Sequence, residues 1–421
     1  MFFWYKIFTY LIYPFSTIYL ILRIINKKED PVRYKEKLAK INASRESGFL
    51  IWFHVASVGE AMSILPLIEY CIEEKKINKI LITSITLSSG KILKKKYGEK
   101  TKVVHQFLPL DIPVFINKFL NHWKPNLSIF IDSEIWPNLI LQAAEKKIPL
   151  LLVNARITKK TFNRWRIISR STKKLFEKFD LCISSNKESE HYLKTLGAKN
   201  IKNYGNLKFS QVRSNSNLEL ESSIVNKIKN RKMWCAASTH PSEEVLCGHS
   251  HLKIKKIYPD VLTIIIPRHI ERVNKIYAEL SKLNLKVSLY SNFNQMNKDS
   301  DILIVDSYGE SIKFYNMSKY VFIGKSLVKS LINNSGQNPI EPARLGCKIF
   351  HGPNVKNFVE IYDYLKDLGI SKIVNNADEL SSSLIEEFKQ NKQKNDEIST
   401  KIEKYGQNIF DSVVVELKKY I

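Results

Sequence analysis

The feature that most restricts the fold of this chain is an alternation of short β-branched runs with amphipathic helical patterns, which occurs twice. Because helices that connect successive strands make those strands parallel, the alternation predicts a mostly parallel, doubly wound sheet in each half. In the first half the expected strands are residues 48–54, 79–84, 102–107, 127–132, 149–153 and 180–184, with helices at 61–75, 113–122 and 136–146. In the second half they are residues 232–237, 261–266, 285–290, 301–305, 320–324, 347–351 and 372–375. We therefore expect an α/β protein with two Rossmann-like domains.

A polar, turn-rich stretch around residues 205–220 separates the two halves and is typical of a linker. A chain of 421 residues is also too long for one ordinary core. We expect an N-terminal domain at residues 29–210, a C-terminal domain at 211–385 and a Lys-rich helical tail at 386–421. Such a pair of domains has a cleft between them, and ligands bind beyond the carboxyl ends of the strands.

Residues 1–28 are expected to form a membrane anchor. The stretch at residues 2–25 is rich in aromatic side chains and carries only two charges, Lys6 and Arg23. Its uncharged part is shorter than the roughly 20 residues that span hydrocarbon, and Pro14 interrupts it. Basic residues follow at once, which predicts that the remainder is cytoplasmic. A buried first helix is the alternative, but Trp and Tyr side chains suit a membrane interface better.

The charge of the chain points to anionic partners. Lys and Arg number 66 against 41 Asp and Glu, which gives a net charge of +25. Such an excess favours nucleic acid, an anionic membrane or phosphorylated substrates as partners. No nucleic-acid-binding module, no P-loop and no G-x-G-x-x-G after the first strand is recognisable in the sequence. The five scattered cysteines form no C-x-x-C pair, which is typical of small buried side chains in a reducing compartment.

Acidic and basic residues follow strands in the first half. Ser57-x-x-Glu60 has the spacing of a capping box, in which Ser and Glu satisfy backbone N–H groups at a helix start. Glu60 could also be a general base, because the helix dipole favours its ionised form, although the spacing alone favours the cap. For Asp132 and Glu134, a charged helix start and a chemical role are equally well supported. The local sequence around Lys208 favours an exposed surface lysine over a lysine that contacts an anion.

The second half places further polar groups after its strands. Arg268 and His269 directly follow a three-Ile strand, and arginine suits bidentate binding of phosphate or carboxylate. Ser307-x-x-Glu310 repeats the capping spacing of the first half. Glu341 lies at another expected helix start, where it could hold ribose hydroxyl groups. Each pattern alone is weak, and it is their expected convergence on one edge of a sheet that points to a ligand site.

Taken in order, these segments resemble the 3-deoxy-D-manno-octulosonic acid (Kdo) transferase family of lipopolysaccharide biosynthesis. The segments are HVASVGE (54–60), IDSEIWPNLI (131–140), NARIT (154–158), GNLKF (205–209), AASTHPSEE (236–244), IPRHIER (266–272), DSYGES (306–311), FIGKSL (322–327), QNPIEPA (337–343) and GPNVKNF (352–358). The resemblance implies the GT-B fold, two Rossmann-like domains that face each other across a cleft. It also implies transfer of Kdo from CMP-Kdo to a lipid A precursor, lipid IVA, at the cytoplasmic face of the inner membrane, without a metal or other cofactor.

The resemblance further implies roles for individual residues. Glu60 would be the general base for the acceptor hydroxyl, and Glu134 and Lys208 would support the transition state. The donor CMP-Kdo would be held by Pro267, Arg268, Tyr308, Gly309, Glu310, Asn338, Pro339, Ile340 and Glu341, with His269 as a neighbour. The other partners would be the glycolipid acceptor and an anionic membrane surface, and no nucleic acid.

The chain departs from the family pattern after the strand expected at 320–324. Lys325 stands where the family usually has a glycine, and the loop at residues 328–334 is longer. Two other functions stay open. The first is another metal-independent GT-B enzyme, a UDP-sugar transferase or a sugar-nucleotide epimerase. The second is a basic membrane- or nucleic-acid-binding protein without catalysis.

Overall fold

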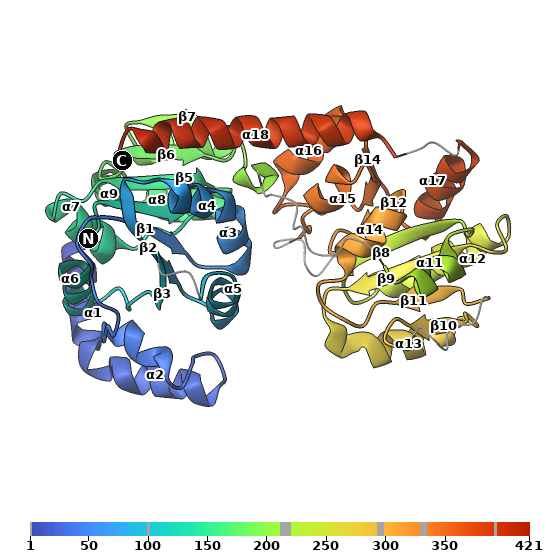
Figure 1. Ribbon diagram of the computed structural model, residues 1–421, viewed down its shortest axis with the longest axis horizontal. Helices are drawn as coiled ribbons and strands as arrows, with labels where there is room; N and C mark the ends of the chain where they lie inside the picture. Colours follow the sequence, from blue (N-terminus) through green and yellow to red (C-terminus); the bar gives the residue numbers. More distant parts are fainter. Residues whose placement is uncertain (1, 99–101, 211–219, 293–298, 329–334, 391–393) are drawn as a thin grey trace. The chain divides into compact units, whose positions relative to one another are not determined.

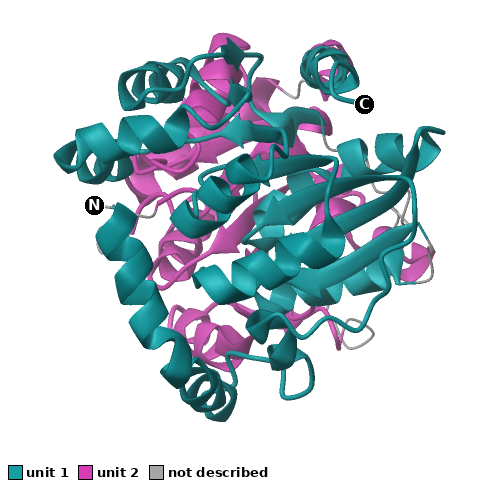
Figure 2. Cartoon of the chain, turned by 90° about the vertical axis from the view of Figure 1, so that its left-hand side faces the viewer, with its two compact units in different colours: residues 1–212, 405–421 teal, residues 213–404 magenta. Residues whose placement is uncertain are grey.

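The computed structural model divides the chain into two compact units (Figures 1 and 2). Unit 1 comprises residues 1–212 and 405–421, and unit 2 comprises residues 213–404. The residues that the structure describes are 2–98, 102–210, 220–292, 299–328, 335–390 and 394–421. Each unit is an α/β layer structure around one parallel sheet, which confirms the predicted fold class of two parallel-sheet units.

Unit 1 is built on a seven-stranded sheet in the order β3-β2-β1-β4-β5-β6-β7, in which every pairing is parallel. Its strands are β1 (Phe49–Val55), β2 (Ile77–Ser84), β3 (Val103–Phe107), β4 (Leu127–Ile131), β5 (Leu150–Ala155), β6 (Leu181–Ser184) and β7 (Ile201–Asn203). The chain passes from β1 to β2 and β3 on one side, and then crosses to β4 on the other side of β1. The strand order therefore reverses between β1 and β4, and this topological switch point is where such sheets bind ligands.

Helices cover both faces of the unit 1 sheet, so its apolar strands are buried on both sides. They are α3 (Val58–Ser63), α4 (Leu65–Glu73), α5 (Leu87–Tyr97), α6 (Pro113–Trp123), α7 (Pro137–Glu145), α8 (Lys159–Ile167), α9 (Ser169–Phe176) and α10 (Lys187–Leu196). The single helix predicted at residues 61–75 is in fact two helices that meet at Ile64. The break follows from Pro66, which lies in the first turn of α4 and cannot donate a helical N–H.

Unit 2 repeats this arrangement with the strand order β10-β11-β9-β8-β12-β13-β14, again with parallel pairings. Its strands are β8 (Met233–Thr239), β9 (Leu262–Pro267), β10 (Val287–Leu289), β11 (Ile302–Ile304), β12 (Tyr320–Ile323), β13 (Lys348–His351) and β14 (Ser371–Ile373). The order reverses between β8 and β12, which makes that pair the switch point of the second sheet.

The helices of unit 2 lie between these strands in the sequence. They are α11 (Ser222–Ile228), α12 (Glu243–Lys255), α13 (Val273–Ser281), α14 (Ser311–Met317), α15 (Ile340–Arg344), α16 (Val359–Asp367) and α17 (Ala377–Gln390), with the 3₁₀ turn η4 (Ile270–Arg272). The long helix α18 (Asp396–Lys418) begins in unit 2 and ends in unit 1. All five cysteines are buried and free, as the sequence indicates.

Two segment boundaries of the sequence analysis differ from the structure. The expected start of the helical tail at residue 386 falls inside α17, because the apolar pattern of that helix begins well before the Lys-rich stretch. In the expected linker, residues 207–210 form the 3₁₀ helix η3 (Leu207–Ser210), with Leu207 and Phe209 buried. Residues 211–219 of that linker lie outside the described residues.

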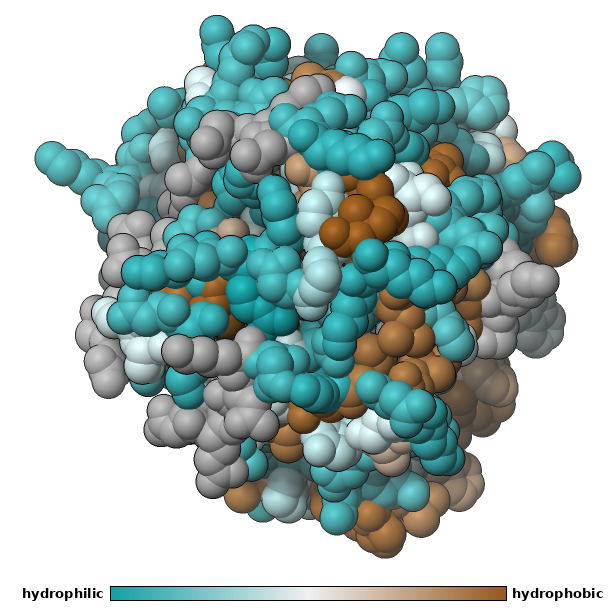
Figure 3. Space-filling view, turned by 90° about the vertical axis from the view of Figure 1, so that its right-hand side faces the viewer, coloured by the Kyte–Doolittle hydropathy of each residue, from teal (hydrophilic) through white to brown (hydrophobic). Residues whose placement is uncertain are grey.

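The N-terminal segment consists of α1 (Phe2–Ile12), the 3₁₀ turn η1 (Tyr13–Phe15) and α2 (Ser16–Ile25). Together they are long and apolar enough, by length and composition, to cross a membrane. In Figure 2 these helices run along the border of unit 1. Their exposed large apolar side chains are Phe3, Trp4, Ile7, Phe8, Tyr10, Leu11, Ile12, Tyr13, Phe15, Ile18, Tyr19, Ile21, Leu22 and Ile25. By contrast, hydrophilic side chains predominate on the face shown in Figure 3.

The other side of α1 is attached to unit 1 by polar contacts. The Tyr5 hydroxyl donates to Asp111 Oδ2 at 2.9 Å, and Asn138 Nδ2 donates to Thr9 Oγ1 at 3.0 Å. The Asp111 carboxylate also accepts the backbone N–H groups of Asn138 and Leu139 at the start of α7. The segment therefore has one side docked on the unit and one apolar side that is exposed.

Candidate functional site

Glu60 lies in the first turn of α3, directly after β1. Ser57 caps this helix, since its hydroxyl oxygen accepts the Glu60 N–H at 3.3 Å. The Glu60 carboxylate in turn accepts the Ala56 N–H at 2.6 Å and the Ser57 hydroxyl proton at 2.8 Å. The capping interpretation is thus correct in outline, with the N–H of Ala56 in place of the N–H of Ser57. Capping and a chemical role do not exclude each other here.

The environment of Glu60 disfavours its ionised form. The pKa of the Glu60 carboxyl group is raised from 4.5 to about 7, chiefly by burial and then by the negative charge of Asp132, while the hydrogen bond from the Ala56 N–H opposes the shift. A carboxyl group with this pKa can accept a proton near neutral pH and release it again. This is the property that a general base requires.

Asp132 lies at the end of β4, the neighbour of β1 in the sheet. Its backbone has a φ of 56°, and Asn154 Nδ2 donates to its Oδ1 at 2.6 Å. Burial raises the pKa of Asp132, while the positive charge of Lys208 opposes the shift. Asn154 Oδ1 also accepts the Leu207 N–H at 2.9 Å, so this buried amide connects the end of β4 to η3, which carries Lys208.

Glu134 follows Asp132 and is held from two sides. Trp136 Nε1 donates to Glu134 Oε2 at 2.9 Å, and His54 Nε2 lies 3.4 Å from the same oxygen. His54 is fully buried at the end of β1, and its Nδ1 lies 2.9 Å from Thr83 Oγ1. The structure therefore brings Glu60, Glu134 and Lys208 to one edge of the sheet, at the switch point between β1 and β4.

In unit 2, Pro267 ends β9, and Arg268 and His269 follow with exposed side chains. The Arg268 N–H donates to the carbonyl oxygen of Thr239 at 3.1 Å, which ties the end of β9 to the end of β8. The rings of His269 and His240 are 5.7 Å apart. Burial lowers the pKa of His240 to about 4, so that this side chain is neutral at pH 7.

The segment Tyr308 to Glu310 follows β11. The Tyr308 hydroxyl donates to Glu271 Oε1 at 3.1 Å, and Glu310 accepts from Lys313 at 2.8 Å. The predicted capping box at Ser307 and Glu310 is wrong: Glu310 itself is the N-cap residue of α14, and no side chain caps this helix. The physical reason is Gly309, whose left-handed φ of 88° cannot belong to a first helical turn.

The remaining predicted donor residues lie at the start of α15, which precedes β13. Asn338 Oδ1 accepts the Ile340 N–H at 3.1 Å, Pro339 is the N-cap residue, and Glu341 is exposed in the first turn. Most of the loop that the sequence analysis singled out at 328–334 lies outside the described residues. Because β9, β11 and β12 are parallel, the predicted donor residues all lie beyond the carboxyl edge of one sheet.

Sequence reasoning missed the role of Glu243. Its carboxylate accepts the backbone N–H groups of His240 at 2.9 Å, Lys325 at 2.7 Å, Ser326 at 2.9 Å and Leu327 at 3.0 Å. It therefore connects the end of β8 to the loop after β12 across the switch point of unit 2. The sequence offers only an acidic residue in a first helical turn, which is a common pattern without a specific meaning.

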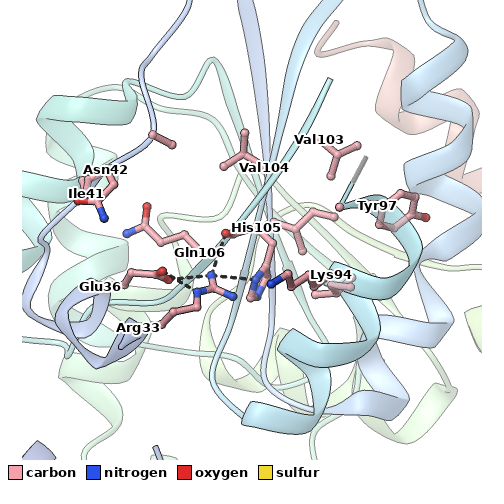
Figure 4. A pocket seen from close by; sticks show the side chains of 14 residues that line it. Arg33, Glu36, Ile41, Asn42, Lys94, Tyr97, Val103, Val104, His105 and Gln106 are labelled. Carbon is pink, nitrogen blue, oxygen red and sulfur yellow. Dashed lines mark hydrogen bonds and ion pairs between the residues drawn. The ribbon is translucent and has the colours of Figure 1, made fainter. Parts of the chain in front are cut away.

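A cavity of about 400 Å³ in unit 1 lies beside the edge strand β3 (Figure 4). Its polar groups largely satisfy one another, since Arg33 makes two hydrogen bonds to Glu36, at 2.7 and 2.9 Å, and one to the His105 carbonyl oxygen at 3.0 Å. None of the predicted site residues lines it. Among the residues that the structure describes, no group of three or more His, Cys, Asp or Glu side chains is arranged to hold a metal ion.

Comparison with known proteins identifies the family. The family profile described as 3-deoxy-D-manno-octulosonic-acid transferase (kdotransferase) matches residues 32–211. The chain is 34% identical over 357 residues to the 3-deoxy-D-manno-octulosonic acid transferase of Rickettsia bellii, which covers 85% of this chain and 84% of that protein. It is 30% identical over 361 residues to the transferase of the same name from Haemophilus influenzae, covering 84% and 83% of the two chains.

A solved structure shares the fold at much lower identity. The UDP-GlcNAc 2-epimerase of Neisseria meningitidis bound to UDP-GlcNAc aligns with a TM-score of 0.58 at 13% identity, covering 87% of this chain and 99% of the epimerase. At that identity the likeness concerns the two-unit fold alone. The family is established by the relatives of 30% identity and more: this chain belongs to the 3-deoxy-D-manno-octulosonic acid transferases, which are glycosyltransferases.

Proposed function

We propose that this transferase moves Kdo from CMP-Kdo to a lipid A precursor such as lipid IVA, with Glu60 as the general base. The observation that carries the base assignment is the position of Glu60 at the switch point of unit 1, with a pKa raised to about 7. A carboxyl group that only capped a helix would be expected to have a lowered pKa, because the helix N-terminus stabilises the anion. The environment of Glu60 acts in the opposite direction.

In the proposed reaction an acceptor hydroxyl group attacks the anomeric carbon of Kdo. A C–O bond forms to the acceptor oxygen, while the bond from the anomeric carbon to the CMP phosphate oxygen breaks. The hydroxyl proton passes to Glu60, and the electron pair of the broken bond leaves with CMP. Glu134 and Lys208 would stabilise the charges that develop beside Glu60. The sugar nucleotide is the activated substrate, and the reaction requires no organic cofactor.

The donor assignment is supported by the cationic groups beyond the unit 2 sheet. CMP-Kdo carries a phosphate and a sugar carboxylate, so a site for it requires positive charge. Arg268 has an exposed guanidinium group, and no described residue forms an ion pair with it. An unpaired arginine at a strand end is suited to bidentate contact with either anion. The other predicted donor residues lie beyond the same edge.

The location proposed for the enzyme is the cytoplasmic face of the inner membrane, through the N-terminal segment. The exposed apolar side chains of α1 and α2 match the interior of a bilayer, while Trp4 and the tyrosines match its interface. A lipid acceptor also has to be reached at a membrane. The net charge of +25 favours approach to an anionic surface.

The test is a transfer assay with CMP-Kdo and lipid IVA on the full chain. We expect Glu60→Gln to lower kcat about 10²- to 10⁴-fold, the range for loss of a general base. The matched control is Glu73→Gln, which makes the same change at an exposed position of α4 and should leave the rate unchanged. Equal transfer by wild type and Glu60→Gln, both folded, would show that Glu60 is not the base.

Thermal unfolding with added nucleotides separates the alternative sugar-nucleotide enzymes. We expect CMP to raise the unfolding temperature of the wild-type protein and UDP to leave it unchanged, because only a ligand that binds the folded state stabilises it. Stabilisation by UDP alone would favour a UDP-sugar transferase or an epimerase. A chelator such as EDTA should leave the transfer rate unchanged if the reaction is metal-independent.

A further inference from the structure

We propose that Lys325 binds an anionic group of the sugar-nucleotide donor, as a second cation beside Arg268. This inference rests on the proposed function. Three independent features of unit 2 support it: the position of Lys325 in the sheet, its backbone conformation and the lack of a partner for its charge.

The first feature is position. Lys325 follows the end of β12, and β12 pairs with β8, which in turn pairs with β9. The ends of these three neighbouring strands lead to Lys325, His240 and Arg268 respectively. The strand order reverses between β8 and β12, so Lys325 lies at the switch point of this sheet. Ligands of doubly wound sheets bind at that place, beyond the carboxyl ends of the strands.

The second feature is the backbone. Lys325 has a φ of 58°, in the left-handed region that favours glycine and costs free energy for a lysine. The conformation persists because Glu243 holds three successive N–H groups, those of Lys325, Ser326 and Leu327. A side chain at Gly324 would meet the Ser238 carbonyl oxygen at 2.7 Å, so the loop is also packed tightly. The hydrogen bonds of Glu243 therefore hold the backbone that carries Lys325 in one place, next to the end of β8.

The third feature is charge. Within the described residues, no acceptor or carboxylate lies against the Lys325 ammonium group. The Glu243 carboxylate, which holds this loop, directs its oxygens to backbone N–H groups. Partial burial lowers the pKa of Lys325, and the positive charge of Arg268 lowers it further. The two cations therefore repel each other, and a bound anion would relieve this repulsion.

A second arginine in the same region shows what a structural cation looks like. Arg272 makes two hydrogen bonds to the buried Glu244 carboxylate, at 2.9 and 3.1 Å, and its charge is neutralised. Neither Arg268 nor Lys325 has such a partner among the described residues. The contrast indicates that these two side chains are kept available for an anion from outside the chain.

The experiment measures binding of CMP and of CMP-Kdo to the full chain, and thermal unfolding, for wild type, Lys325→Gly and Lys325→Gln. We expect both variants to weaken donor binding about 10- to 100-fold, the effect of losing one charge-assisted hydrogen bond. Lys325→Gly should unfold at or above the wild-type temperature, because glycine adopts the left-handed conformation freely. Weaker binding together with unchanged or higher stability is a result that loss of folding cannot produce.

The two ligands identify the anionic group involved. If Lys325 contacts the phosphate, both CMP and CMP-Kdo bind more weakly to the variants; if it contacts the sugar carboxylate, only CMP-Kdo does. Either result supports the inference. The control is Lys282→Gln, which removes an exposed lysine after α13 and should change neither ligand.

Two different failures can be told apart. If wild type binds CMP-Kdo and both Lys325 variants bind CMP and CMP-Kdo equally well, Lys325 has no part in donor binding and only this inference is overturned. If wild type binds neither ligand, the proposed function itself fails, and the inference fails with it.

Discussion

Unit 1 and unit 2 share the plan of a seven-stranded parallel sheet that reverses its strand order once, yet several candidate residues beyond their strand ends differ in charge. At the ends of β1 and β4, unit 1 places carboxylates such as Glu60 and Asp132. At the ends of β9 and β12, unit 2 places Arg268 and Lys325. Burial shifts Glu60 and Lys325 toward their neutral forms, so the pKa of Glu60 rises and the pKa of Lys325 falls.

The shared sheet plan places these residues beyond strand ends, and the loops that follow the strands determine which side chains lie there. A carboxylate that is half protonated near pH 7 suits proton transfer, whereas unpaired cations suit a phosphate or a carboxylate. Under the proposed function, unit 1 would support the acceptor half of the glycosyl transfer and unit 2 the donor half. The predictions below test this division.

The largest expected effect on stability concerns the paired arginine of unit 2. Arg272→Ala should lower the free energy of unfolding by about 3 to 5 kcal/mol, because it leaves the fully buried Glu244 carboxylate without its partner. Arg268→Ala should change it by no more than about 0.5 kcal/mol. Urea unfolding measures both, and similar values for the two variants would remove the distinction between structural and ligand-binding cations.

The next effect concerns donor binding. Arg268→Ala should raise the KM for CMP-Kdo about 10- to 100-fold, since a charge-assisted contact is lost. The KM for the lipid acceptor should stay within about twofold, because Arg268 belongs to the donor half. Steady-state kinetics with each substrate varied in turn provide the measurement. An equal rise of both KM values would contradict the division between the units.

A smaller effect appears in the pH dependence of stability. The folded state raises the pKa of Glu60 from 4.5 to about 7, so its stabilising contribution is complete below pH 4.5 and is lost as the pH rises through 7. Glu60→Gln stays neutral throughout, so it should gain stability relative to wild type by about 1 to 3 kcal/mol between pH 5 and pH 8. Urea unfolding at both pH values tests this, and a constant difference would argue against the raised pKa.

The smallest effect concerns the neighbour of Glu60. Transfer by wild type should increase with pH through a limb near 7, and Asp132→Asn should move that limb to lower pH by less than about one unit. The shift is small because burial is the larger cause and Asp132 the second. A pH–rate profile of kcat measures it. A limb that moves upward would mean that Asp132 lowers the pKa of Glu60, which contradicts the electrostatic effect of its negative charge.

Much of the fold could be predicted from the sequence, because parallel strands buried on both faces leave continuous apolar runs. The strand at 127–132 is an example, since β4 reads LSIFI and is buried throughout. The strand β7 (Ile201–Asn203) was not predicted, because it is three residues long and only half-buried. Elements of that size are determined by tertiary pairing and leave no periodic pattern.

The candidate site was predictable only where a residue directly follows a strand. Glu60, Glu134 and Arg268 could be placed in this way. Asn154 and Glu243 could not, because their roles consist of hydrogen bonds to backbone groups more than 50 residues away in the sequence. The spacing Ser307-x-x-Glu310 gave a wrong prediction. The local pattern is that of a capping box, but the left-handed backbone at Gly309 prevents the first helical turn that a capping box requires.

The most direct test of the account compares CMP binding with Kdo transfer in the same two variants. Glu60→Gln should bind CMP with the affinity of wild type and transfer Kdo at least 100-fold more slowly, because it removes the base and leaves the donor site intact. Arg268→Gln should bind CMP at least tenfold more weakly. If Glu60→Gln lost CMP binding to the same extent as Arg268→Gln, the assignment of base and donor site to separate units would be wrong.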